Sequence, residues 1–311
     1  MASAKGSGTG GSKARGGTGS GSGSGGGRAA TAGTGASARL MSGATLLPAG
    51  NAAAAAMHVS EAETAHVLRL AKVLGNAAET NAARDAALAE MEKIAKERGV
   101  AAMLHPSTLP TVASGLVSFV TVTAVEAFLP MLAPRLWIVG KLAAESPKAR
   151  DMFLNDARTW PIVALGLQVG LAPANIAPGL TQAAAWAMCN LCEGQLADEQ
   201  VHAVLHVLKP LLQSDDVETL VHTCWSVSHM CEDSAHVQSV VDADVCPALV
   251  QLLSHRNMRV VKPALRAVGN IVCSEEDRDL TQQVCDSGAV ASLAKLIRNP
   301  HRELQKEACW T

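Results

Sequence analysis

Residues 186–190 (Trp-Ala-Met-Cys-Asn) and 266–270 (Arg-Ala-Val-Gly-Asn) decide the fold. Each stretch places an Asn four residues after a large flat or cationic side chain, inside an apolar pattern of helical period. Between them the frame recurs with His in place of Asn. The large residues follow one another at intervals of 39, 41 and 44 positions, at Trp186, Trp225, Arg266 and Trp310. A helical pattern repeating about every 40 residues predicts an α-solenoid, whose repeats bury their apolar faces against their neighbours.

The large residue and the residue four positions later share one helix face. Stacked repeats therefore align these pairs in a row, which we call the ladder. Each pair is one rung, named after its large residue. Asn amides both donate and accept hydrogen bonds, so the row can bind the main chain of an extended peptide. Parallel Trp rings leave slots for the stem and charge of a Lys or Arg. The alternative is that these Trp and Asn residues are ordinary interior residues. A buried Asn is costly unless it is paired, which favours a surface ladder.

Composition and charge limit the class of protein. The chain has 311 residues, of which 48% are hydrophobic and 3% aromatic, enough for one sizeable helical domain and a tail. Residues 1–180 carry 16 Lys/Arg against 11 Asp/Glu, whereas residues 181–311 carry 10 against 17. The acidic second part argues against a nucleic-acid ligand and for a basic peptide.

The chain divides into a tail and a helical domain. Residues 1–56 are rich in Gly, Ser and Ala without apolar period, which predicts a disordered tail. Residues 57–311 form the predicted repeat domain, and Gly99 is expected to end its first helical pattern. Residues 99–125 contain no charged side chain but are short and interrupted, so a buried helix is favoured over a membrane span. Residues 99–135 are a degenerate repeat, in which Pro130 and Pro134 are expected to break the helix.

Five segments carry a resemblance to a known family. They are residues 140–151 (GKLAAESPKARD), 185–192 (AWAMCNLC), 224–228 (CWSVS), 260–272 (VVKPALRAVGNIV) and 305–311 (QKEACWT). These segments resemble importin α, the armadillo-repeat receptor for nuclear localisation signals. The resemblance covers a little over half of the chain, residues 134–311, and implies a right-handed armadillo-repeat superhelix.

The resemblance also implies a function without catalysis. It predicts a nuclear import adaptor of the cytoplasm and nucleus, whose groove binds the basic nuclear localisation signals of cargo proteins. Importin α normally begins with a dense Arg/Lys segment that binds importin β. Residues 1–56 contain only five cations and match no such segment, so the resemblance gives no support for importin β as a partner. The alternative is an armadillo scaffold protein that no longer transports cargo.

The resemblance assigns ten residues to the peptide groove. They are Trp137, Glu145, Trp186, Asn190, Glu218, Trp225, Arg266, Asn270, Glu307 and Trp310. Glu145 matches an acidic position that holds a lysine head in the family. Glu218 matches another acidic groove residue, and Glu307 precedes the last Trp by one turn as in the family.

Three positions depart from the family pattern. Lys141 stands where the Trp137 rung would have Asn, and it is expected either to repel a Lys-rich ligand or to pair with Glu145 one turn away. His222 replaces the acid one turn before Trp225, and the chain ends before the Asn of its last rung.

Competing chemistries are weaker. Cys189 and Cys192 form a C-x-x-C, but without a second close pair they are more simply small core residues than a zinc or redox site. The sequence has no G-x-S-x-G, H-E-x-x-H, P-loop or dinucleotide fingerprint. We therefore expect neither an enzyme nor a cofactor or metal, and no nucleic-acid or membrane partner.

Overall fold

The computed structural model describes residues 59–118, 125–171, 177–274 and 278–311, and the elements within these ranges are all helices. The predicted tail, residues 1–56, lies outside them. The helices are α2 (Glu61–Gly75), α3 (Asn81–Arg98), α4 (Ala101–Leu104), α5 (Leu109–Val117), α6 (Val125–Glu145), α7 (Pro147–Leu154), α8 (Thr159–Leu171), α9 (Pro178–Cys192), α10 (Asp198–Leu211), α11 (Val217–Met230), α12 (Ser234–Asp242), α13 (Cys246–Leu252), α14 (Met258–Val272), α15 (Arg278–Asp286), α16 (Ala289–Leu296) and α17 (Arg302–Trp310).

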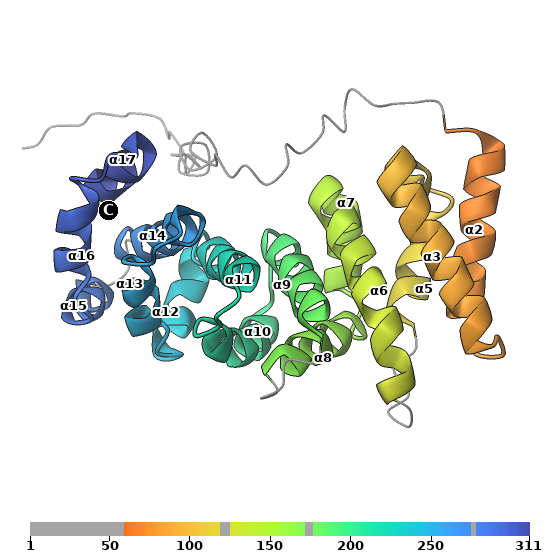
Figure 1. Cartoon of the computed structure of the whole chain (residues 1–311), viewed down its shortest axis with the longest axis horizontal. Helices are drawn as coiled ribbons and strands as arrows, with labels where there is room; N and C mark the ends of the chain where they lie inside the picture. Colours follow the sequence, from red (N-terminus) through yellow and green to blue (C-terminus); the bar gives the residue numbers. More distant parts are fainter. Residues whose placement is uncertain (1–58, 119–124, 172–176, 275–277) are drawn as a thin grey trace, which may run out of the picture. The chain divides into compact units, whose positions relative to one another are not determined.

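Five helices form a consecutive row: α6, α9, α11, α14 and α17, which we call the ladder helices. Each packs against the next, and α3 packs against α6 (Figure 1). The intervening helices α7–α8, α10, α12–α13 and α15–α16 connect them and pack against them or against one another. This repeated order confirms the predicted all-α solenoid.

The starts of the three central ladder helices, α9, α11 and α14, are set by short polar side chains or by proline. Asp216 accepts a hydrogen bond from the backbone N–H of Thr219 and so caps α11. Asn257 caps α14 in the same way, and α9 begins at Pro178, where the missing N–H leaves no intrahelical bond unmade. These caps fix where each helix enters the row, and thereby the phase of its ladder residue.

The core between the helices consists of Ala, Leu, Val and a few larger side chains. On α6, Leu132, Leu136, Ile138, Val139 and Leu142 are among the fully buried side chains. Burying an aliphatic side chain of this size stabilises the fold by about 1.5–3 kcal/mol. Because Leu132, Leu136, Val139 and Leu142 are spaced by three or four residues, they share one helix face, and their burial leaves Trp137 of the same helix at the edge of the core.

The first helical pattern contains two helices that end and begin at recognisable signals. Ser60 and Glu63 form a capping box at the start of α2, and Thr80 caps α3. Gly99 ends α3 with a φ of 77°, as predicted, because a residue without Cβ adopts this conformation without strain.

The expected break at Pro130 and Pro134 is wrong. Both prolines lie inside α6, which continues to Glu145. A proline inside a helix removes one backbone hydrogen bond and costs about 3 kcal/mol. The burial of Leu132 and Leu136 on the same turns offsets this cost and keeps the segment helical.

A buried arginine joins α6 to the preceding helix. Arg135 is fully buried, and its Nη1 donates to the carbonyl oxygens of Gly115, Leu116 and Ser118 at 3.0, 3.0 and 3.1 Å. These carbonyls are at the end of α5, where a helix leaves acceptors unmatched. Burial lowers the pKa of Arg135 to about 10, so the side chain stays charged at neutral pH.

The apolar stretch before α6 is part of this packing. Its helix α5 has nine residues, and Leu109, Val112 and Leu116 are buried in the core. Across the described ranges, the helices lack the combined length and hydropathy that a bilayer crossing requires.

Candidate functional site

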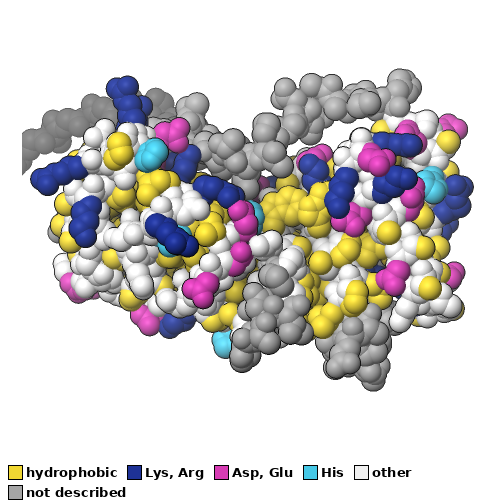
Figure 2. Space-filling model, in the orientation of Figure 1, with side chains coloured by type: hydrophobic (Ala, Val, Ile, Leu, Met, Phe, Trp, Pro, Cys, Tyr) yellow, Lys and Arg dark blue, Asp and Glu magenta, His cyan; other side chains and the backbone are white. Residues whose placement is uncertain are grey.

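The ladder helices bring the predicted large residues to successive positions. Trp137 lies on α6, Trp186 on α9, Trp225 on α11, Arg266 on α14 and Trp310 on α17. The first three rings are half-buried, and Trp310 is 51% exposed. On the face shown in Figure 2, hydrophobic side chains gather over α6 and α9, and basic and acidic side chains lie beside one another toward both ends.

On α6, α9, α11 and α14, a small residue three positions after the large one lets the next helix approach. A Cβ added at Gly140 would lie 3.0 Å from the Cα of Ala187 and 3.0 Å from the Trp186 ring. A Cβ at Gly269 would lie 2.7 Å from the ring of Trp310. Cys189 and Ser228 hold the same position on α9 and α11, and both are buried. This small residue sets the separation of neighbouring rungs.

The Trp137 and Trp186 rings contact each other directly. Their centroids are 6.1 Å apart, and the rings are tilted by 34°. A methylene stem placed between two rings needs about 7–8 Å, since each carbon contact takes about 3.5–4.0 Å. The slot expected between these two rings is therefore closed. Within the described ranges, no ring contact joins Trp225 to Trp186, so these two rings are the remaining candidates for the walls of a slot.

The two ladder Asn side chains are hydrogen-bonded inside the protein. Asn190 is only 2% exposed, and its Nδ2 donates to the Trp186 carbonyl at 2.9 Å. Nδ2 of Asn270 donates to the Ser228 carbonyl of α11 at 3.0 Å, which ties α14 to its neighbour. The expected surface position is thus wrong for Asn190. Close helix stacking buries its amide, and a buried amide needs a partner.

His229 and three charged groups surround the Trp225 rung. The His229 ring stacks on Trp225 with a centroid distance of 5.8 Å. Its Nδ1 lies 3.2 Å from the carboxylate of Glu232, and its Nε2 lies 3.9 Å from that of Glu193. Glu193 also forms an ion pair with Arg150. Two carboxylates and one guanidinium give this region an excess negative charge.

The Trp137 rung already holds cations of the chain. The ammonium of Lys96 lies 5.4 Å from the centroid of the Trp137 ring, within the range of a cation–π contact. The Nζ of Lys141 lies 2.6 Å from a carboxylate oxygen of Glu145. Of the two alternatives for Lys141, pairing with Glu145 is the one observed. Glu145 is therefore neutralised within its own helix.

Glu218 is paired as well, across two helices. Arg259 of α14 donates to both of its carboxylate oxygens, at 2.5 and 2.7 Å. These hydrogen bonds hold the pKa of Glu218 below its ordinary value. Burial lowers the pKa of the adjacent His222 to about 4, and Arg259 adds to that lowering. His222 is thus neutral at pH 7 and does not supply the negative charge of the acid it replaces.

The last two ladder helices are joined by ion pairs. Arg266 Nε lies 2.8 Å from a carboxylate oxygen of Glu307, and its guanidinium lies 5.7 Å from the Trp310 ring centroid. Lys262 donates to Glu303 at 3.0 Å. Burial raises the pKa of Glu307, although Arg266 opposes this rise. Glu307, the predicted acid of the Trp310 rung, is therefore paired with Arg266, the large residue of the preceding rung.

Comparisons with known proteins identify the same kind of repeat. A sequence profile of the Armadillo/beta-catenin-like repeat matches residues 233–273 and 277–311, the segments that contain α12–α14 and α15–α17. Importin subunit alpha-1b of Oryza sativa subsp. japonica is 37% identical over 180 residues, 57% of this chain and 32% of that protein. Importin subunit alpha-3 of Arabidopsis thaliana is 35% identical over 167 residues, 52% of this chain and 30% of that protein. The chain is a divergent, partial relative of importin α.

The chain spans about a third of the length of these importin α relatives. Among solved structures, a designed armadillo repeat protein in complex with a (KR)4 peptide has a TM-score of 0.61 and 18% identity, covering 78% of this chain and 97% of that one. A computationally designed armadillo repeat protein for modular peptide recognition has a TM-score of 0.64 at the same identity and the same coverage of both chains. At this identity the likeness concerns the fold alone.

Two cations of the chain that contact predicted ladder residues were not predicted from the sequence. Lys96 and Arg259 were not among the predicted site residues, yet they contact Trp137 and Glu218. A signal was present: Arg259 precedes Arg266 by seven residues, two helical turns, and therefore lies on the ladder face. Glu193, beside His229, was also missed.

The cysteines give no sign of the alternative metal or redox chemistry. Across the described ranges no three His, Cys, Asp or Glu residues are grouped as a metal site would require. Burial raises the pKa of Cys189 well above its ordinary value and that of Cys192 to about 12. Both thiols are thus protonated and unreactive at neutral pH. Five of the eight cysteines are buried: Cys189, Cys192, Cys224, Cys231 and Cys246.

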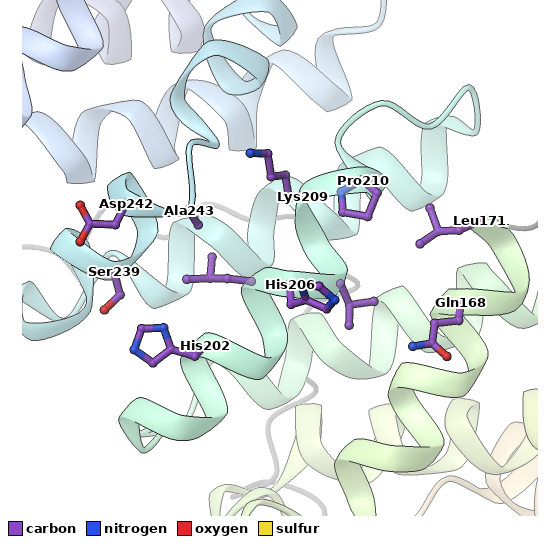
Figure 3. A pocket seen from close by; sticks show the side chains of 11 residues that line it. Gln168, Leu171, His202, His206, Lys209, Pro210, Ser239, Asp242 and Ala243 are labelled. Atoms are coloured by element: carbon purple, nitrogen blue, oxygen red, sulfur yellow. The ribbon is translucent and has the colours of Figure 1, made fainter.

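A hollow of about 600 Å³ lies away from the ladder, between α8, α10 and α12 (Figure 3). Gln168 and Leu171 line it from α8, His202 and His206 from α10, and Asp242 from α12. None of the ten predicted site residues lines this hollow.

Proposed function

We propose that the ladder binds a basic, extended segment of a partner protein and that the chain acts as an adaptor in nuclear import. One Lys or Arg of the ligand lies beside Trp186 and Trp225, with its methylene stem on the rings and its charge near Glu193. The importin α relatives support the class of function. The half-buried rings of Trp186 and Trp225, which we call the central rungs, support the proposed position of the ligand cation.

The proposal rests on the net negative charge around the central rungs. Glu193 and Glu232 face a single guanidinium, that of Arg150, and His229 lies between the two carboxylates. A ligand cation restores neutrality here without displacing any group of the protein. A partly desolvated cation also gains on the order of 0.5–2 kcal/mol from an aromatic face.

The test is a titration of a fluorescent peptide with one central lysine against Trp186→Ala. We expect the substitution to weaken binding by on the order of 1–3 kcal/mol, because it removes ring contact and cation–π attraction. Asn190→Ala should cost less than about 1 kcal/mol, since its amide N–H already bonds the Trp186 carbonyl. Fluorescence anisotropy at fixed ionic strength measures both.

Val290→Ala is the control outside the ladder. Val290 lies on α16 and is 62% exposed, so its loss should change peptide affinity less than twofold. Circular dichroism and thermal unfolding verify that each variant is folded. Equal affinity of the parent and the Trp186→Ala variant would remove the ladder as the binding site.

A second candidate function is an armadillo scaffold without transport activity. The observation that favours it is the pairing of Glu145, Glu218 and Glu307 with cations of the chain itself. Peptide titration separates the two functions, because a scaffold of this kind would not bind the basic peptide.

A further inference from the structure

The ladder acids that flank the central rungs are held by cations of the same chain. Arg259 is the clearest case, since its two terminal nitrogens meet the two carboxylate oxygens of Glu218. Glu218 precedes Trp225 by seven residues, and Arg259 precedes Arg266 by seven, so the pair lies on the ladder face of α11 and α14.

A ligand lysine gains nothing by displacing this arginine. The planar guanidinium matches a carboxylate with two parallel hydrogen bonds, whereas an ammonium meets it as a point charge. Exchange would replace one ion pair with a weaker one and leave Arg259 free beside the new cation. Exposed ion pairs change an equilibrium constant by less than about fivefold, so the exchange brings no net affinity.

At the Trp137 rung, on the other side of the central rungs, cations of the chain also contact the aromatic ring and the acid. Lys141 lies 2.6 Å from Glu145 one helical turn away, and Lys96 lies over the Trp137 ring. The nearest aromatic face and the nearest carboxylate are thus both in contact with resident cations. Lys96 is itself paired with Glu92 at 2.6 Å, so an additional ligand lysine at this rung meets two ion pairs that are already formed within the chain.

We infer that Lys141 and Arg259 determine specificity by pairing with Glu145 and Glu218, so that the ladder recognises one central Lys or Arg and gains no affinity from further basic residues of the ligand. This inference rests on the proposed function and names the ligand class more narrowly. Residues flanking the central cation can therefore be neutral or acidic, because an acidic residue can approach Arg259 without breaking its pair with Glu218.

The experiment compares two fluorescent peptides of equal length, one with a single central lysine and one with three lysines at alternate positions. They are titrated against the parent, Arg259→Gln and Lys141→Gln at about 0.15 M salt. Lys209→Gln is the control, because Lys209 pairs with Asp244 on connecting elements outside the ladder helices.

We expect the parent to bind both peptides within about twofold of each other. Arg259→Gln and Lys141→Gln should each raise affinity for the three-lysine peptide about fivefold and change the single-lysine affinity less than twofold. Lys209→Gln should leave both affinities unchanged. Thermal unfolding of each variant verifies that it remains folded.

Two results would overturn the inference: tenfold tighter binding of the three-lysine peptide to the parent, or an unchanged ratio of the two affinities in Arg259→Gln. If neither peptide binds the parent, the proposed function fails for this chain. The three-lysine peptide then decides the inference alone: binding to Arg259→Gln supports it, and absence of binding ends it.

Discussion

The ladder has two halves that share a backbone frame and differ in the side chains that fill it. In the first half, α6, α9 and α11 present three Trp residues, two of which contact each other through their rings. In the second half, α11, α14 and α17 are joined by ion pairs between Arg259 and Glu218 and between Arg266 and Glu307. Residues at the same position of successive ladder helices therefore need not make the same kind of interaction. The aromatic half keeps an excess of negative charge, whereas each cation of the ion-paired half faces one acid.

The largest expected effect concerns α11, which belongs to both halves. Its His222 has a folded-state pKa of about 4 against an ordinary value of 6.5. The unfolded chain therefore takes up this proton first, and stability falls as the pH drops from 6.5 toward 4. We expect the parent to lose on the order of 2 kcal/mol more than His222→Gln between pH 7 and pH 4.5. Urea unfolding at both pH values measures this difference, and equal losses would contradict the burial argument.

The second prediction compares the two halves by adding one methyl group. Gly140→Ala should cost about 1–3 kcal/mol, because its Cβ meets the backbone of Ala187 and the packed Trp186 ring. Gly269→Ala should cost less than Gly140→Ala, since its Cβ meets the far end of the exposed Trp310 ring and the Thr311 hydroxyl, and both side chains can turn aside.

Gly179→Ala is the control for this pair. Gly179 lies in α9 with no neighbouring atom within 4 Å of its added Cβ, so Ala should stabilise the helix by up to about 1 kcal/mol. Thermal unfolding of the three variants gives the ranking. A larger loss at Gly269 than at Gly140 would reverse our view of which half is packed more tightly.

The smallest effects distinguish two acids within the ion-paired half. Hydrogen bonds from Arg259 lower the pKa of Glu218, so its contribution to stability is present above pH 4.5 and is lost as the pH falls through its folded-state pKa. Glu218→Gln should therefore cost about 0.2–1 kcal/mol at pH 7. Burial raises the pKa of Glu307, so its charged form opposes folding, and its protonation as the pH falls toward 4.5 raises stability.

It follows that Glu307→Gln should leave stability at pH 7 unchanged or slightly higher. Urea unfolding at pH 7, at low and high salt, measures both substitutions. The loss in Glu218→Gln should shrink at high salt because the pair with Arg259 is exposed to solvent. Identical losses for the two Gln substitutions would mean that burial does not distinguish these acids.

Much of the fold could be predicted because the repeat is visible in the chain itself. The recurrence of Trp and Asn in a helical frame gave the helical class and the order of the ladder residues. The buried position of Asn190 could not be predicted. Both a surface and an interior Asn fit the same spacing, and the depth of a side chain depends on how closely the neighbouring helix stacks.

The resident ion pairs were predictable in principle but needed the register between helices. Glu218 and Arg259 are 41 residues apart, as are Lys262 and Glu303. Asn270 bonds to Ser228 at a separation of 42. A search for opposite charges one repeat apart would have found the two ion pairs. Local charge patterns could not, because residues facing each other across two helices are distant in sequence.

The buried cysteines make the unmodified chain its own reporter of local opening. A thiol reacts with an alkylating reagent only as an exposed thiolate. Cys189 and Cys224 lie within the core of successive repeats, whereas Cys273 and Cys309 are exposed. Pulsed alkylation read by mass spectrometry would therefore time the opening of each repeat separately. The exposed thiols would calibrate the intrinsic reaction rate within the same molecule, without any introduced label.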